Sequence, residues 1–455
     1  MALSRLPPEL RIRIAQELNN DRTETARQSG RDLALVSRDW RDIGTAIVWE
    51  TLDLSWSKPD FTRRVAHMRS NPHLYHFVSV VDLDLDCQPS GEYLDQSYES
   101  LAAEEDRSVA LNRFATEVFP NLTQLRKLTL NAEQLHTAYI PLSASYDTGR
   151  INFPRLEEFK YSFGTAELEE TRFGIRPIEH LFRILPDLAS LKSLDLRLST
   201  ASEAVPPPIP EPPPLQSLEN LRIDLAPCES FLWDEDDGPT DVELEPVLLY
   251  LLSLPCPTRL RTLYVSATFI EHRSLSALKA FTSLTSLTLH FVPDNLEDLV
   301  DSLPSLVASF PLLERLELLA THDHDNIRAV RISPVQLERF LAAVPPTLVA
   351  LTTHFDLGHR DGEQGTRGAE SPCVDLVLEW ITSRSEASAP LESFAYYDAR
   401  YERLHFGDRA PSTGREFVLV EHRTRSARDP KAGTGAAPSG RNPRHYSLMD
   451  DLRYR

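Results

Sequence analysis

One short phrase, L-x-x-L-x-L, recurs along this chain and constrains its fold more than any other feature. The clearest copies are LRKLTL (residues 125–130), LKSLDL (191–196), LTSLTL (284–289) and LERLEL (313–318). The last two apolar positions of each copy are two residues apart. In an extended chain they therefore face one side, while the residues between them face the other. So short a phrase cannot bury its own apolar face, but stacked copies can, which predicts a solenoid.

Degenerate copies of the phrase extend the pattern along most of the chain. They are VSVVDL (78–83), LEEFKY (156–161), LENLRI (218–223), LRTLYV (260–265), LVALTT (348–353) and LESFAY (391–396). From residue 125 onward, successive copies begin between 24 (260 to 284) and 43 (348 to 391) residues apart. This spacing overlaps and exceeds the roughly 20–29 residues of leucine-rich repeats, and the longer intervals predict insertions on the outer side.

Helix-like segments and prolines separate the phrases. Apolar periodicity predicts helices within residues 180–191, 244–254, 296–310, 335–344 and 374–381. Several phrases are preceded by a hydrophobic residue and then proline, as at Phe119-Pro120, Phe153-Pro154, Phe310-Pro311 and Val344-Pro345. Proline cannot continue a helix, and it favours extended geometry in the residue before it. The predicted order is therefore helix, proline stop, strand and loop, repeated, with residues 416–421 as a closing strand.

The composition is that of a globular protein. A chain of 455 residues is too long for one ordinary core, unless the core grows along one axis as in a repeat array. The formal net charge of −20 argues against a nucleic-acid-binding surface. The cysteines are far apart and form no C-x-x-C pair, which favours a reduced, intracellular chain: Cys87, Cys228, Cys256 and Cys373. No signal peptide or membrane span is expected, so the predicted location is cytoplasmic or nuclear.

Residues 1–54 predict a compact helical module. Pro7 and Pro8 are tolerated in the first turn of a helix, and Glu9 suits the dipole there. The first helix carries an apolar residue at every fourth position: Leu6, Leu10, Ile14 and Leu18. A second helical face continues through Leu33, Val36 and Trp40. A bundle this small buries little apolar surface, so a partner is expected to stabilise it.

Three phrases in this module, LPPELRIRIAQEL (6–18), LALVSRDWRDI (33–43) and IVWETLDL (47–54), resemble an F-box. The resemblance implies docking on a Skp-type adaptor, which links the F-box to a cullin-RING ubiquitin ligase of the SCF class. The implied adaptor contacts are Leu6, Pro7, Leu10, Ile14, Leu18, Leu35, Val36 and Trp40. The repeats that follow resemble the irregular leucine-rich repeats found after an F-box in many fungal proteins. The alternative is a scaffold that lacks any ligase role, in which these helices only cap the open end of the array.

The predicted partner-binding surface is the inner, concave face of the array, where the residues between the buried leucines point. Toward the C-terminal half this face gains Tyr and His, and Tyr and Arg are enriched at protein interfaces. The candidate target-binding residues are Arg197, Arg222, Tyr264, His290, Arg315, His354 and Tyr397.

The remaining polar motifs predict no catalytic centre. Residues 322–325 (HDHD) could ligate a metal ion but follow a predicted strand, where a polar loop is expected anyway. No nucleophile elbow, phosphate-binding glycine loop or H-E-x-x-H motif is present, so neither catalysis nor a cofactor is expected. Residues 205–214 (VPPPIPEPPP) predict a polyproline II spacer within a loop at 201–214, and residues 234–237 (DEDD) a solvated turn.

The sequence thus predicts an α/β protein in three parts. Residues 1–54 form a three-helix F-box-like module. Residues 55–425 form an irregular leucine-rich-repeat solenoid, with parallel strands on the concave face and helices and loops on the convex face. Residues 426–455 form a disordered basic tail. The implied function is that of an SCF substrate receptor that binds an adaptor through the module and a target protein through the repeats.

Overall fold

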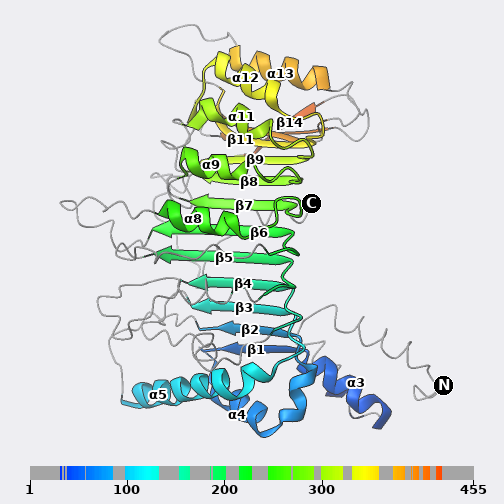
Figure 1. Cartoon of the computed structure of the whole chain (residues 1–455), viewed down its shortest axis with the longest axis vertical. Helices are drawn as coiled ribbons and strands as arrows, with labels where there is room; N and C mark the ends of the chain where they lie inside the picture. The colour runs from blue at the N-terminus through cyan, green and yellow to red at the C-terminus, as the bar shows by residue number, and fades with distance from the viewer. Residues whose placement is uncertain are drawn as a thin grey trace, which may run out of the picture.

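The computed structural model describes residues 31–32, 35, 38–56, 58–85, 98–132, 153–163, 185, 188–200, 215–227, 244–267, 270–291, 299–320, 330–357, 372–384, 391, 393–398, 403–409 and 417–422. Within these residues a single sheet of 14 strands runs along the long axis, with strand neighbours in sequence order apart from the short β10 (Figure 1). No helix in this part of the chain is long and apolar enough to cross a membrane.

The strands pair in parallel from β1 to β12, and the last two pair antiparallel. Their bounds are β1 Thr51–Ser55, β2 Val80–Asp84, β3 Lys127–Ala132, β4 Glu158–Phe163, β5 Ser193–Thr200, β6 Asn220–Pro227, β7 Thr262–Ala267, β8 Ser286–Phe291, β9 Arg315–Ala320, β10 Val330–Arg331, β11 Ala350–Asp356, β12 Ser393–Asp398, β13 Arg403–Arg409 and β14 Phe417–His422. The predicted closing strand is therefore present, as β14. The solenoid prediction is confirmed.

Every L-x-x-L-x-L phrase enters a strand at its third position, and equivalent leucines stack across the sheet. Leu263 of β7, Leu287 of β8 and Leu316 of β9 are in register and 0% exposed. One continuous hydrophobic core runs from Leu52 in β1 to Phe394 in β12. This is the packing expected when each repeat buries its apolar side only against its neighbours.

Helices follow many of the strands and cover the leucine side of the sheet. Their bounds are α3 Arg38–Trp49, α4 Phe61–Ser70, α5 Tyr98–Arg113, α8 Leu244–Ser253, α9 His272–Leu278, α11 Leu303–Val307, α12 Pro334–Ala343 and α13 Pro372–Arg384. Short turns of other helix types are η2 Pro72–Phe77, η3 Phe114–Val118, η4 Phe119–Asn121 and η7 Val300–Ser302. Figure 1 shows α8, α9 and α11 side by side along the stack.

The helices predicted at 244–254, 335–344 and 374–381 are present as α8, α12 and α13. The helix predicted at 296–310 is shorter in its described part, where the 3₁₀ turn η7 precedes α11. The helix predicted at 180–191 lies mostly outside the described residues, and 188–191 form a turn and extended chain before β5. Val344 ends α12 in an extended conformation immediately before Pro345, as the proline stop predicts.

The sheet begins at Thr51, inside the range 1–54 assigned above to the helical module. Leu52 and Leu54 alternate with polar residues and are 2% and 0% exposed, because β1 pairs with β2 as the first rung of the sheet. Helix α4 packs against this rung through buried Phe61, Val65 and Met68. The phrase IVWETLDL therefore joins the last turns of α3 to β1.

Candidate functional site

The polar positions of the strands form the face of the sheet opposite the leucine core, here called the open face. Because the strands pair in register, these positions line up in rows across the sheet. The middle row, in chain order, is Asp53, Asp82, Thr129, Lys160, Asp195, Arg222, Tyr264, Thr288, Glu317 and Thr352. A neighbouring row contains Asp84, Asn131, Ser162, Arg197, Asp224, Ser266 and His290. Most middle-row side chains are half-buried, which leaves one edge of each available to a partner.

The end of the open face formed by β1 and β2 is acidic. Asp82 lies between Asp53 and Asp84, and partial burial raises the pKa of its carboxyl, reinforced by the charges of these two neighbours. Lys127 and Lys160 oppose that shift. Lys58 Nζ lies 3.0 Å from Asp53 Oδ2 and neutralises part of the charge. This end suits a cationic group on a partner.

The centre of the open face holds a cluster of Asp195, Arg197, Arg222, Asp224 and Tyr264, here called the central charge cluster. Arg222 Nε lies 3.7 Å from Asp195 Oδ1, and its terminal nitrogen lies 3.9 Å from Asp224 Oδ2. Arg197 Nε lies 3.9 Å from the same Asp195 oxygen. The Arg222 guanidinium carbon stacks 4.2 Å above the Tyr264 ring centre, a cation–π contact.

The ion pairs of this cluster are loose. Their separations exceed hydrogen-bond length. Three shielded atoms of the cluster have no hydrogen-bond partner among the described residues: Asp195 Oδ1, Arg197 Nε and Arg222 Nε. Buried donors and acceptors without partners are costly, and a partner group, an ordered water or an ion would lower that cost. The cluster therefore has hydrogen-bonding capacity that the fold does not use.

Beyond the cluster, hydroxyl groups of the open face contact an imidazole and a carboxylate. Ser266 Oγ lies 3.1 Å from His290 Nδ1, and Thr288 Oγ1 donates to Glu317 Oε2 at 3.0 Å. Burial raises the pKa of the Tyr264 hydroxyl, the nearby Asp224 charge raises it further, and Arg222 opposes both. Tyr264 is therefore a neutral phenol at physiological pH.

The structure brings together four of the predicted target-binding residues. Arg222 pairs with Tyr264 in register, Arg197 lies on the neighbouring β5, and His290 reaches Ser266 beside Tyr264. Arg315 is exposed at the start of β9. Tyr397 lies in β12, and its side chain is outside the described part of the structure.

His354 corrects one expectation. It occupies an outward position of β11, but it is 4% exposed and cannot contribute to an accessible face. The pairing of β9 with β11 ends at Leu318 and Thr353, so His354 lies beside the C-terminal end of β9. There its Nδ1 is 2.8 Å from the amide nitrogen and 2.9 Å from the carbonyl oxygen of Ala320. Burial lowers its pKa to about 4, opposed by the Ala320 hydrogen bond and assisted by His290.

The predicted adaptor contacts lie in the least described part of the chain. Leu6, Pro7, Leu10, Ile14, Leu18 and Val36 lie outside the described residues. Leu35 is described and is 85% exposed. Trp40 lies in α3, without a description of its side chain.

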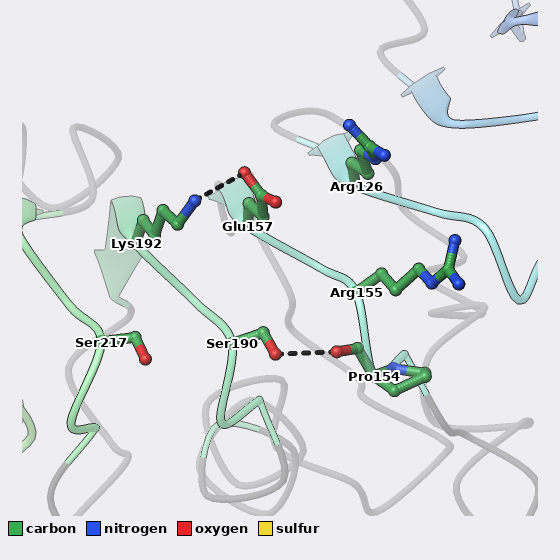
Figure 2. Close-up of a pocket in the computed structure, with 7 residues that line it drawn as sticks. All are labelled: Arg126, Pro154, Arg155, Glu157, Ser190, Lys192 and Ser217. Atoms are coloured by element: carbon green, nitrogen blue, oxygen red, sulfur yellow. Dashed lines mark hydrogen bonds and ion pairs between the residues drawn. The ribbon is translucent and has the colours of Figure 1, made fainter.

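A pocket that the sequence reasoning missed lies at the edge of the sheet where the chain enters β3, β4, β5 and β6. It has a volume of about 330 Å³, and its lining is Arg126, Pro154, Arg155, Glu157, Ser190, Lys192 and Ser217 (Figure 2). Arg126, Glu157 and Lys192 each occupy the second position of an L-x-x-L-x-L phrase. Charged residues at that recurring position are the signal that could have revealed this pocket.

The other sequence motifs have no counterpart in the described structure. Residues 201–214, 234–237, 322–325 and 426–455 lie outside the described residues. Among the residues that are described, no three or more His, Cys, Asp or Glu side chains are placed so that they could hold a metal ion.

No protein-family model matches the chain, and no curated protein matches it. Among solved structures, it is similar to the leucine-rich repeat-containing protein LegL7 from Legionella pneumophila. The identity is 15%, the match covers 72% of this chain and 97% of that chain, and the TM-score is 0.29. It is also similar to an internalin (inlF) from Listeria monocytogenes, with 14% identity, 52% and 63% coverage of the two chains and a TM-score of 0.24.

Proposed function

We propose that this protein is a substrate receptor of an SCF-type ubiquitin ligase, with an adaptor-binding N-terminal module and a target-binding solenoid. The observation that carries the adaptor half is Leu35. This apolar residue of the F-box-like phrase LALVSRDWRDI is 85% exposed, so its side chain is available for docking. An adaptor surface would bury the Leu35 side chain together with the other apolar side chains in segments 6–18 and 33–43.

The open face supports the target-binding half. Its central charge cluster offers two guanidinium groups, two carboxylates and a phenol ring from neighbouring strands. The acidic end at Asp53, Asp82 and Asp84 adds complementarity to a basic segment of a partner. Such charge patterns favour specificity and fast association more than raw affinity.

The chain itself would supply no chemistry in this role. Its contribution would be proximity, because it holds a target lysine near a thioester formed on another subunit. The continuous core between Leu52 and Phe394 suits this task, since it joins the strands near the N-terminal module to the rest of the open face.

A scaffold without a ligase role is the second candidate, and one observation favours it. Helices α3 and α4 cover the first rung of the sheet, where the rings of Trp49 and His67 stack with centres 5.1 Å apart. This is how a cap protects the end of an array. If the protein is such a scaffold, the exposed Leu35 side chain would not contact an adaptor.

Direct binding to a purified Skp-type adaptor tests the proposal. The full-length wild-type chain is expected to co-elute with the adaptor, and Leu35→Asp and Leu6→Asp are expected to abolish co-elution. Val335→Asp is the matched control, because Val335 is an exposed apolar residue, 56% accessible, at the other end of the array. Failure of the wild-type chain to bind any Skp-type adaptor would remove the ligase role and leave the scaffold.

A further inference from the structure

The edge pocket of Figure 2, here called the rim pocket, has a local excess of positive charge. Three cations, Arg126, Arg155 and Lys192, line it together with one anion, Glu157. Lys192 Nζ lies 3.1 Å from Glu157 Oε2, so these two charges largely neutralise each other. Two guanidinium groups remain in excess, in a chain whose formal net charge is −20.

The donors of the two arginines are only partly used. Arg126 is exposed, and within the described residues no hydrogen bond or ion pair engages its guanidinium. Arg155 donates one N–H to Gln124 Oε1, which holds the side chain in place and leaves its other donors available. Figure 2 shows Arg126 on the far side of Glu157 from Lys192, and the Arg155 side chain extending away from the Lys192–Glu157 pair.

Several backbone amides of this edge are already occupied, which leaves the charged side chains as the main groups for recognition. The amides of Glu157 and Glu158 both donate to the Arg126 carbonyl, and those of Lys192 and Ser193 to the Glu157 carbonyl. Ser190 donates its hydroxyl to the Pro154 carbonyl at 2.7 Å. A ligand of this pocket is therefore an anion that guanidinium groups can chelate.

We propose that the rim pocket binds a dianionic phosphoryl group. Two uncompensated guanidinium groups match its charge, and their planar forks hydrogen-bond to phosphate oxygens in pairs. The group could be inorganic phosphate or a phosphorylated side chain. Binding of a phosphorylated side chain rests on the proposed target-binding function. The pocket adjoins the open face, because Arg126 and Glu157 directly precede the first residues of β3 and β4, Lys127 and Glu158.

The test measures binding of two probes to the full chain by isothermal titration calorimetry at constant ionic strength. The probes are inorganic phosphate and a phosphoserine peptide, with the unphosphorylated peptide as reference. Arg126→Gln and Arg155→Gln are each expected to weaken binding about tenfold, the effect of one charge-assisted hydrogen bond. Glu157→Gln is expected to strengthen it, because it removes a repulsive carboxylate and frees Lys192.

Arg261→Gln is the matched control. Arg261 is exposed and holds the same phrase position as Arg126, but it precedes β7, outside the pocket. Tighter binding of inorganic phosphate than of the peptide assigns the site to a free anion, and the reverse assigns it to a phosphorylated partner. Absence of binding of both probes, equal loss in Arg261→Gln, or weaker binding to Glu157→Gln would overturn the proposal. None of these outcomes depends on the adaptor.

Discussion

At the scale of single residues, the central charge cluster contributes little to the stability of the fold but offers charged and aromatic groups to a partner. Its ion pairs are 3.7 to 3.9 Å long and partly exposed, so they contribute little to folding. The sequence could predict that Arg222 and Tyr264 are neighbours, because equal phrase positions pair in register. It could not predict the cation–π geometry, which depends on side-chain rotamers.

Arg222→Gln is expected to lower the free energy of unfolding by only about 1 kcal/mol, since it removes one cation–π contact and two loose ion pairs. The same variant is expected to lose target binding while it keeps adaptor binding. Urea titration and a pull-down from the same preparation provide the two measurements. A stability loss similar to that of a core truncation would show that Arg222 has a structural role instead.

His354 predicts a pH dependence of stability. Its folded pKa of about 4 lies below the ordinary value of 6.5, so between these values the unfolded chain takes up a proton that the folded chain does not. The stabilisation that neutral His354 contributes to the fold is fully present above pH 6.5, and it is lost as the pH drops toward 4. At about pH 5 the expected loss is about 2 kcal/mol.

Urea titrations at about pH 7 and about pH 5 check this prediction. In His354→Gln, the difference in the free energy of unfolding between the two pH values should shrink by the amount that His354 contributes. An unchanged difference would mean that another group causes the acid sensitivity. The burial of His354 could not be predicted, because it depends on where β9 ends relative to β11.

At the scale of elements, the phrase and the proline stops predicted the strands well because both act locally. Alternating leucines fix which side of each strand is buried. Proline marks the end of α12 at Val344-Pro345, whereas Phe119 before Pro120 stays helical and Pro120 lies in η4. The first strand was assigned to the helical module because its residues 51–54 belong to the F-box-like phrase IVWETLDL. Its pairing with β2 is a tertiary contact that a local pattern does not reveal.

Helix α12 has a capping box that provides an element-scale prediction. The Ser333 hydroxyl accepts from the Gln336 amide at 3.3 Å, and Gln336 Oε1 accepts from the Ser333 amide at 3.0 Å. Ser333→Ala should therefore cost about 1 kcal/mol. Hydrogen exchange should show faster exchange confined to α12 and its neighbours, whereas Ser276→Ala, inside α9, should have a smaller effect.

At the scale of the whole molecule, stability comes from nearest-neighbour stacking along one core. Leu287 in β8 is fully buried between Leu263 and Leu316, so Leu287→Ala should cost about 3 kcal/mol, from lost burial and the cavity left behind. Leu312→Ala is the control, because Leu312 is 47% exposed. A calorimetric scan of both variants checks the difference, and equal losses would contradict stacking as the source of stability.

The overall architecture was predictable because a repeated phrase specifies one arrangement many times. The rim pocket was predictable only in part, since the charges at the second phrase positions are visible in the sequence, whereas Pro154, Arg155 and Ser190 join them only in the folded chain. The same holds for the acidic end of the open face, where Asp53 joins Asp82 through the β1–β2 pairing.

The central claim is that one chain uses two separate surfaces, an N-terminal adaptor site and the open face. Quantitative affinity purification of wild type, Leu35→Asp and Arg222→Glu tests it most directly. The account predicts that Leu35→Asp loses the Skp-type adaptor and keeps the remaining partners, and that Arg222→Glu keeps the adaptor and loses a partner. Recovery of the same proteins with all three chains would contradict the account.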